Sequence, residues 1–194
     1  LFLLNAGKKE YKPELLHLPN YLTAKADPAV LRPGKMGKLV VTLKSNQLHG
    51  LGLTQSSVYL SRFAGDRVNK DNELGISVTL LPNFTAAELN SPQAPLAEMA
   101  TSIDLGAFNG KSKLKGTVVL TNKGQSPLVI NMLQVYNPGI SVALSKTTLR
   151  PGESTDMKIV VSSAVERFRG SRKVLLITND PRHPKISLDV ITKK

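Results

Sequence analysis

The sequence predicts an all-β protein built from two tandem β-sandwich domains. Short runs rich in valine and isoleucine recur along the chain, separated by residues typical of turns. The same turn motifs return after about 118 residues, and no long segment keeps a helical spacing of apolar residues. Short strands with a turn every ten or so residues are the pattern of a sandwich or barrel.

The repeat is visible in the order of its motifs as well as in their spacing. Leu31 returns as Leu149, each opening the same Leu-Arg-Pro-Gly motif, at an offset of 149 − 31 = 118. Asn5 returns as Asn122, each with a glycine two residues on, at an offset of 122 − 5 = 117. Constant order at a nearly constant offset indicates two copies of one domain.

The last strand of the repeat has a shorter offset. The Ile-Ser-Val sequence at residues 76–78 returns as Ile-Ser-Leu at residues 186–188, only 186 − 76 = 110 positions later. We therefore expect a longer loop in the first copy, at residues 62–72, which are charged and contain glycine. Each copy then has about 85–100 residues, the size of an immunoglobulin-like sandwich.

The alignment of the copies predicts the domain boundaries and a missing strand. Leu1 aligns with Val118, so the first copy has no counterpart of residues 103–116. We expect that segment to lie upstream of this sequence or to leave an open sheet edge, which favours pairing with another strand. The expected parts are an immunoglobulin-like sandwich at residues 1–84 without its N-terminal strand, a connector at 85–102 and a second such sandwich at 103–194.

The connector combines prolines with a helix-start signal. Residues 82–102 contain three prolines and little strand pattern. Thr85 and Glu88 have the spacing of a capping box, in which each side chain bonds the other residue's backbone N–H. We expect a short helix at residues 85–90.

Three further motifs predict turns. The Pro-Gly pairs at residues 33–34 and 151–152 suit type II turns with glycine at positive φ. The Asn-Lys-Gly motif at residues 122–124 suits a tight hairpin with Gly124 in the left-handed region. Asp180 stands before a proline in a third turn, where its carboxylate caps the backbone.

Composition and charge exclude some functions without selecting one. The chain has 26 Lys+Arg and 14 Asp+Glu, a net charge of 26 − 14 = +12, and no cysteine. A disulfide framework, a thiolate metal site and a thiol nucleophile are therefore excluded. We expect no transmembrane segment, because no apolar run is long enough. The first residue is Leu1, so we expect a processed or truncated segment with any export signal upstream.

Two groups of basic residues are candidate contacts for an anion or a partner. Residues 91–194 carry 15 basic and 7 acidic side chains, or +8, against +4 for residues 1–90. One group alternates along an expected strand and would project from one face: Lys111, Lys113 and Lys115. The other group brackets an expected turn at Gly170 and would form either an anion-binding hairpin tip or an ordinary exposed loop: Arg167, Arg169, Arg172 and Lys173. For the lysines, protection of an exposed strand edge is the alternative that we favour.

No catalytic or metal-binding constellation is recognisable, so we expect neither an enzyme nor a cofactor. His17, His49 and His183 show none of the His–His or His–acid spacings typical of a metal site. Asp66, Asp71 and Glu73 could offer oxygen ligands to Ca²⁺, but their spacing fits no EF-hand loop. A charged, solvated loop is the favoured interpretation.

The second copy resembles a known family. Its motifs are the sequence Thr-Asn-Lys-Gly at residues 121–124, Leu-Arg-Pro-Gly-Glu at 149–153 and Thr-Asn-Asp-Pro at 178–181. These resemble an uncharacterised family of tandem immunoglobulin-like domains from Bacteroidetes, related to major-sperm-protein and ASH-type sandwiches. The resemblance implies an extracytoplasmic protein, in the periplasm or at the cell surface, with no catalytic residues to carry over. Many members have a Cys-Gly-Cys motif that residues 136–140 lack, so a metal or redox role attached to it is not inherited.

Three functional hypotheses remain open. The first is a non-catalytic cell-envelope module for protein interaction or scaffolding that uses sheet edges and loops. The second is binding of a polyanion, an acidic polysaccharide or nucleic acid, by the basic second domain. Nucleic acid is the less favoured polyanion, because aromatic residues are only 5% of the chain and do not alternate with basic ones. The third is a structural spacer.

Overall fold

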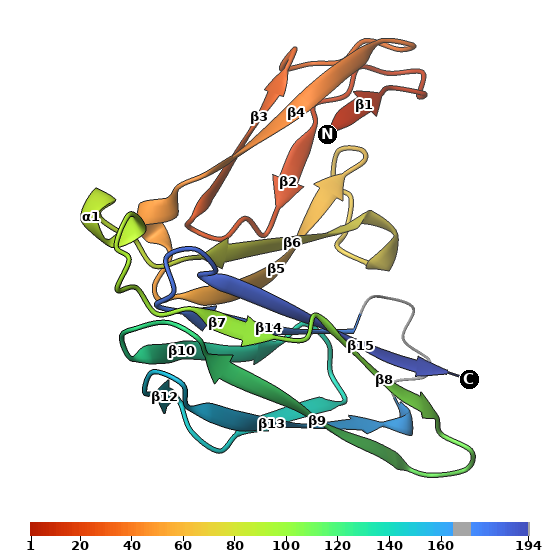
Figure 1. Cartoon of the computed structure of the whole chain (residues 1–194). Helices are drawn as coiled ribbons and strands as arrows, with labels where there is room; N and C mark the ends of the chain where they lie inside the picture. The colour runs from red at the N-terminus through yellow and green to blue at the C-terminus, as the bar shows by residue number, and fades with distance from the viewer. Residues whose placement is uncertain (165–171, 194) are drawn as a thin grey trace. The chain divides into compact units, whose positions relative to one another are not determined.

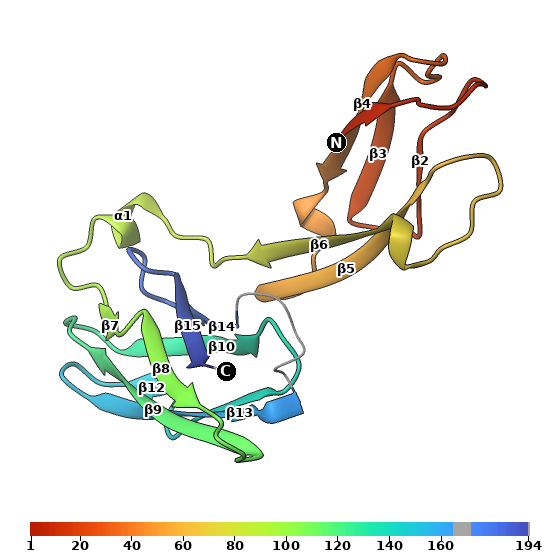
Figure 2. The ribbon, with the colours of Figure 1, turned by 90° about the vertical axis from the view of Figure 1, so that its right-hand side faces the viewer.

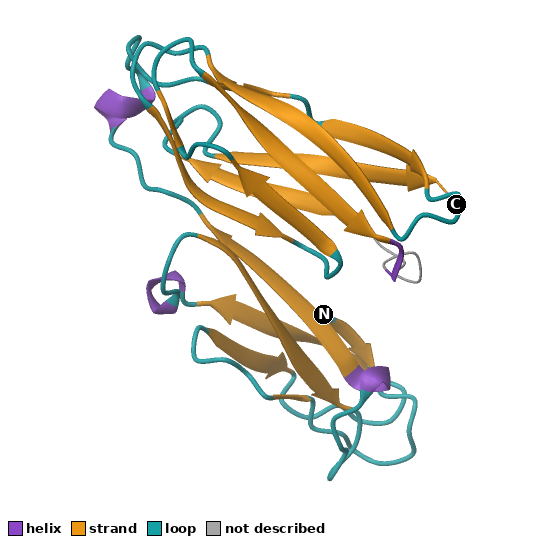
Figure 3. Cartoon of the chain, turned by 90° about the horizontal axis from the view of Figure 1, so that it is seen from below, coloured by secondary structure: helices purple, strands orange, loops and turns teal. Residues whose placement is uncertain are grey.

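The computed structural model describes residues 1–164 and 172–193 and divides the chain into two compact units. Unit 1 comprises Leu1–Gly50 and Thr54–Leu80, and unit 2 comprises Leu51–Leu53 and Leu81–Lys194. Nearly all regular structure in both units is β-strand, as predicted (Figures 1 and 3). In the described part of the chain, no helix has the length and apolar character needed to cross a bilayer.

Unit 1 consists of two three-stranded sheets. In the first, β4 (Met36–Leu43) lies between β1 (Phe2–Leu4) and β3 (Leu22–Asp27), as Figure 1 shows. Figure 2 shows β3 and β4 of this sheet from another side. In the second, β5 (Gly52–Ser61) lies between β2 (Glu14–Leu16) and β6 (Glu73–Leu80). Two short 3₁₀ turns, Ser45–Gln47 and Lys70–Asn72, precede β5 and β6. The sheets share a small buried core: Leu15, Tyr21, Leu22, Leu39 and Val58.

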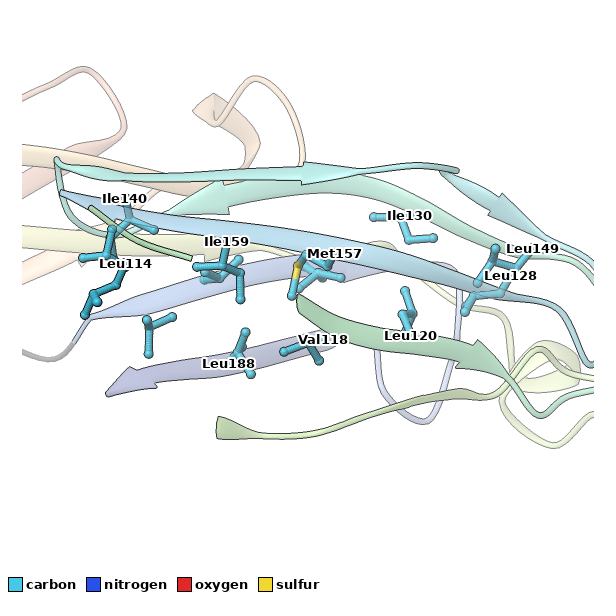
Figure 4. Close-up of a cluster of buried hydrophobic side chains, with 14 of the residues drawn as sticks. Leu114, Val118, Leu120, Leu128, Ile130, Ile140, Leu149, Met157, Ile159 and Leu188 are labelled. Atoms are coloured by element: carbon cyan, nitrogen blue, oxygen red, sulfur yellow. The ribbon is translucent and has the colours of Figure 1, made fainter. Parts of the chain in front are cut away.

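Unit 2 is a larger sandwich. Its five-stranded sheet has the order β12 (Thr148–Leu149), β10 (Leu128–Val135), β14 (Lys173–Thr178), β15 (Lys185–Lys193), β8 (Ser102–Ala107). Its four-stranded sheet has the order β11 (Ile140–Leu144), β13 (Ser154–Ser162), β9 (Lys113–Asn122), β7 (Ala97–Met99). Side chains from both sheets interdigitate in the core (Figure 4), among them Leu120, Leu128, Met157, Ile159 and Leu188, all 0% exposed.

The alternation of side chains along a strand explains this core. Along β13, Met157, Ile159 and Val161 point inward and are completely buried, while Asp156 and Lys158, which alternate with them, are exposed. This two-residue period was visible in the sequence.

The repeated asparagine forms the same hydrogen bonds in both units. Asn5 donates from Nδ2 to the carbonyl oxygens of Lys9 and Leu31, and Asn122 donates to those of Ser126 and Leu149. In each case Oδ1 accepts from the backbone N–H of the glycine two residues on, at 2.9 Å. The sequence repeat is therefore also a repeat of local structure.

The turn predictions are confirmed at the Pro-Gly pairs and wrong at Gly124. Gly34 and Gly152 have φ of 70° and 77°, as a turn with glycine at its third position requires. Gly124 has no positive φ, and its segment leads from β9 into β10 in the other sheet, so it is no hairpin. It is needed for space instead, because a Cβ there would lie 2.4 Å from the carbonyl oxygen of Ala94.

The expected helix is present, and part of the expected connector is a strand. The helix α1 (Ala86–Leu89) has both capping-box bonds between Thr85 and Glu88. Within residues 85–102, where the connector was expected, β7 pairs with β9. Ala97 of β7 also donates its N–H to the buried carboxylate of Asp180, at 2.9 Å. A three-residue strand held by such a distant partner leaves no periodic sequence pattern.

Candidate functional site

One strand edge of unit 1 is only partly paired. In unit 2, β9 pairs with β13 over all of Ser154–Ser162. In unit 1, β1 pairs with β4 over Met36–Lys38, and Leu1 and Leu39 exchange N–H···O bonds of 3.0 and 2.8 Å. Beyond Leu39, this side of β4 has no strand partner among the residues that the structure describes. We call residues 40–43 on this side the open edge.

The pairing register shows what occupies the same place in unit 2. Paired residues of β9 and β13 have numbers that add to 275, as in Thr121 with Ser154. Those of β1 and β4 add to 40, as in Phe2 with Lys38. Subtracting the two repeat offsets, 275 − 117 − 118, also gives 40, so the registers are identical. The part of β9 that would continue β1 along the open edge is therefore residues 114–117.

Side chains at equivalent positions are buried on β13, which is paired along its whole length by β9, and more exposed on β4, which is paired by β1 only in part. Ile159 and Val161 of β13 are 0% exposed, whereas their counterparts Val41 and Leu43 are respectively half-buried and 43% exposed. In unit 2, Leu114 lies opposite Val161 and Gly116 opposite Ile159. The side chains of Ile103 and Leu105 from β8 pack over Gly116: a Cβ there would lie 2.7 and 2.4 Å from them. Unit 1 has no equivalent of this covering segment within the described chain.

The backbone at the open edge is available for pairing. Residues of an antiparallel strand alternate in which neighbour their N–H and C=O groups face. Leu39 bonds to Leu1, so Val41 and Leu43 direct their backbone groups to the same, open side. Lys44 instead donates to Tyr21, on the β3 side. Val41 and Leu43 thus offer to an incoming strand backbone donors and acceptors that have no strand partner in the part of the chain that the structure describes.

The outer face of the same sheet carries an exposed apolar patch. Phe2, Met36, Leu4 and Val40 are 83, 66, 59 and 46% exposed. Leu4 is paired directly with Met36. Neighbouring apolar residues on an exposed sheet face are typical of a protein-binding surface.

The predicted lysine group is only partly on a strand. Lys111 lies in the turn before β9, where its N–H donates to Phe108, so it does not share the face of the others. Lys113 and Lys115 are exposed on β9 and, with Lys158 of β13, lie on the outer face of the sheet. None of the three has an ion pair within the described residues. Within the described ranges this half of β9 is an edge, because β7 pairs only with residues 120–122.

The predicted arginine hairpin is described only in part. Arg167 and Arg169 lie outside the described residues. Arg172 Nη1 donates to Thr192 Oγ1, and Lys173 forms an ion pair of 3.3 Å with Asp189, its partner across β14 and β15. These two basic side chains thus contact the neighbouring strand.

A hollow of about 780 Å³ in unit 1 lies against residues 5–12 and 61–66. Tyr11 lines it and donates its hydroxyl to the carbonyl oxygen of Ser61. Burial, with the charges of Asp66 and Glu14, raises the pKa of Tyr11. Charged side chains of both signs line the hollow, so no single ligand charge is selected.

The acidic loop residue Asp66 is held by a cation of the chain itself. Arg62 donates to its carboxylate from Nε at 2.8 Å and from Nη2 at 3.1 Å. These side-chain bonds first, then the bond from the Arg62 N–H, hold the pKa of Asp66 well below its ordinary value. This agrees with the favoured interpretation of a charged loop.

Two histidines, His17 and His183, have local structural partners. His17 contacts Tyr59 edge-on, with ring centroids 5.4 Å apart. His183 Nδ1 lies 3.1 Å from Asp180 Oδ2, and the spacing of three residues in this pair is not among the His–acid spacings typical of a metal site. Asp180 is 0% exposed and accepts from the N–H groups of Ala97 and Arg182. No cluster of three or more potential metal ligands occurs among the described residues.

Comparison with known families assigns the second unit. Residues 95–191, 97 of the chain's 194, match the family described as HYDIN/CFA65/VesB-like, Ig-like domain. The chain belongs to this family of Ig-like domains. Within this HYDIN/CFA65/VesB-like chain, the match covers every strand of unit 2 from β7 to most of β15.

Solved structures show the same fold. A protein of unknown function from Porphyromonas gingivalis W83 aligns with a TM-score of 0.68 and 21% identity, over 98% of this chain and 88% of that one. This supports the expected resemblance to an uncharacterised Bacteroidetes Ig-like family. No curated protein sequence matches this Ig-like chain significantly.

Two protease structures of Vibrio cholerae are more distant. VesB aligns with a TM-score of 0.43 and 14% identity, over 84% of this chain and 46% of that one. VesC aligns with a TM-score of 0.37 and 14% identity, over 90% and 36%. The Ig-like chain therefore spans less than half of either protease.

Proposed function

We propose that this protein is a non-catalytic interaction module of the cell envelope that binds protein partners by adding their strands to its sheets. The observation that carries the proposal is the open edge of β4. An incoming strand would pair with the backbone of Val41 and Leu43 and cover their side chains. The main-chain hydrogen bonds would supply affinity, and the side-chain contacts would supply specificity.

The proposal includes the two-domain organisation expected from the sequence. Unit 1 would be an incomplete copy of the Ig-like domain in unit 2, at about residues 1–84. The identical bonds of Asn5 and Asn122, and the identical register of β1–β4 and β9–β13, support this organisation. The kinship with major-sperm-protein and ASH-type sandwiches remains a prediction.

An extracytoplasmic location, in the periplasm or at the cell surface, is part of the same proposal. It rests on the family resemblance, and a chain without cysteine has no thiols that an oxidising compartment could cross-link. The partner would be another envelope protein.

The test is capture of partners from an envelope extract of the host by immobilised wild-type chain and two variants. Leu43→Lys places a charge on the inner face of the open edge, where an added strand would have to bury it. Leu89→Lys is the matched control, because Leu89 is 48% exposed on α1, close to the 43% of Leu43. Washes at low and high salt separate specific partners from non-specific anions.

We expect a protein that survives the high-salt wash on the wild type and on Leu89→Lys and is lost from Leu43→Lys. Equal retention by all three chains would contradict binding at the open edge. If no protein survives the wash, the spacer hypothesis takes its place.

A second candidate function has one observation in its favour. Lys113, Lys115 and Lys158 lie on one sheet face without an ion pair among the described residues, and could bind an acidic polysaccharide. Such binding would weaken steeply as salt rises, because it releases counterions. Replacing the three lysines with serine should abolish it, and a salt-independent affinity would exclude it.

A further inference from the structure

Unit 1 has an edge strand in its second sheet as well, and the inference drawn from both edges rests on the proposed function and refines it. In unit 2, β8 pairs in parallel with the edge of β15, and the side chains of Leu188 and Val190 below it are 0 and 4% exposed. In unit 1, β6 is an edge strand, and Val78, the counterpart of Leu188 at the offset of 110, is only half-buried. Among the described residues, both sheets of unit 1 thus lack a covering strand at corresponding positions, next to β4 and next to β6.

A single segment supplies both covers in unit 2. Residues 102–117 comprise β8, a turn and the first half of β9, so the segment spans the two sheets. Gly116 lies where its two strands meet, under Ile103 and Leu105. This arrangement defines the shape and the register that an occupant of unit 1 needs.

The charges on unit 1 differ from those on unit 2 at the equivalent positions. In unit 2, Lys113 lies opposite Ser162. The same register places the corresponding residue of an occupant opposite Lys44, which is exposed and has no ion pair among the described residues. Lys25 lies beside Val40 on the same outer face and is likewise exposed. A carboxylate is therefore favoured where unit 2 has a lysine.

We propose that unit 1 binds a two-stranded segment of a partner protein that pairs antiparallel with β4 and parallel with β6. The segment has a small residue opposite Val41, an apolar residue opposite Leu43 and an acidic residue opposite Lys44. A partner protein is the occupant, because a strand alone would leave the neighbouring patch of Phe2, Leu4, Met36 and Val40 exposed. A second copy of the chain fits less well, because its own residues 102–117 already pair within unit 2.

The test uses labelled peptides and the whole 194-residue chain. The probe has the sequence of residues 102–117 with Lys113→Glu and Lys115→Glu, and its affinity is measured by fluorescence anisotropy. The unmodified peptide should bind more weakly at low salt, and the difference should shrink as salt rises. A probe that also carries Gly116→Val should bind at least about tenfold more weakly, because the added methyl groups overpack the contact between its two strands.

The register is read by disulfide trapping, which the absence of native cysteine makes unambiguous. Thr42→Cys in the chain should cross-link to a probe with cysteine at position 115, its non-hydrogen-bonded partner in the proposed register. Thr23→Cys, exposed on the outer face of β3, is the control and should not cross-link.

The outcomes separate this inference from the function on which it rests. Trapping at another position, or tight binding of the Gly116→Val probe, would overturn the inference and leave strand addition in place. The inference would also be overturned, and strand addition would remain, if no probe binds while capture of a partner is still sensitive to Leu43→Lys. If residues natively preceding Leu1 occupy the edge, adding them to the chain would abolish probe binding and overturn the partner assignment.

Discussion

Asn122 donates a side-chain hydrogen bond of 3.0 Å to the carbonyl oxygen of Leu149, and Asn5 donates one of 2.8 Å to that of Leu31. Each bond joins the end of one strand to the Leu-Arg-Pro-Gly turn 26 or 27 residues later. The asparagine thus satisfies buried backbone groups where the chain passes between the sheets, which explains why the motif recurs in both halves of the sequence.

Replacing Asn122 with alanine should destabilise unit 2 by about 2–4 kcal/mol, since several buried backbone partners lose their bonds. Asn122 is 0% exposed. The measurement is chemical unfolding monitored by NMR signals of unit 2. Asn46→Ala, at an exposed asparagine in unit 1, is the control and should change stability little. Equal effects of the two substitutions would contradict this role.

Gly124→Ala should cost about 2 kcal/mol or more, because the new Cβ would overlap backbone atoms that cannot move aside. The nearest are the Ala94 carbonyl oxygen and the Leu96 nitrogen, both at 2.4 Å. Gly75→Ala on β6 is the control, since a Cβ there has nothing within 4 Å. It should be neutral or slightly stabilising. If Gly124→Ala left the stability unchanged, the backbone of residues 94–96 could not lie as close to Gly124 as described above.

The Arg62–Asp66 pair predicts an acid-sensitive loop. The pKa of Asp66 is lower in the folded chain than in the unfolded one, so its stabilisation is complete above the unfolded pKa of about 4. It is lost as pH falls below that value towards the folded pKa. Hydrogen exchange at residues 70–72 should therefore accelerate between about pH 6 and about pH 3 relative to intrinsic rates. Asp66→Asn should accelerate exchange already at the higher pH, whereas Asp71→Asn should retain the wild-type profile.

Lys115 should protect the edge of β9. Lys115→Val should promote self-association, seen as a larger species in analytical ultracentrifugation, because an unpaired edge without charge pairs readily with another. Lys158→Val makes the same change on the same face, but on the internal strand β13, and should leave the chain monodisperse if the edge matters. Association of both variants to the same extent would indicate general surface hydrophobicity instead.

Local chemistry made much of the fold predictable. The glycines at positive φ, the Thr85–Glu88 capping box and the alternation along β13 depend on a few neighbouring residues. The role of Gly124 depends on backbone some 30 residues away, which no local pattern records.

The candidate site was predictable only in outline. That unit 1 has no counterpart of residues 103–116 within the described chain was expected from the repeat, but the exposure of Leu43 and the outward patch around Phe2 required the structure. Lys111 was wrongly placed on a strand because the turn at Phe108 interrupts the alternation. The contact of Asp180 with Ala97 joins segments 83 residues apart and left no sequence signal.

An open edge on β4 can be detected directly by amide hydrogen exchange of the free chain, resolved by NMR. We expect fast exchange at Val41 and Leu43 and slow exchange at their counterparts Ile159 and Val161. Val40 and Thr42, whose N–H groups face β3, should remain protected, which distinguishes an open edge from an unfolded strand. Equal protection of Val41 and Ile159 would show that the edge is already paired and would contradict the account.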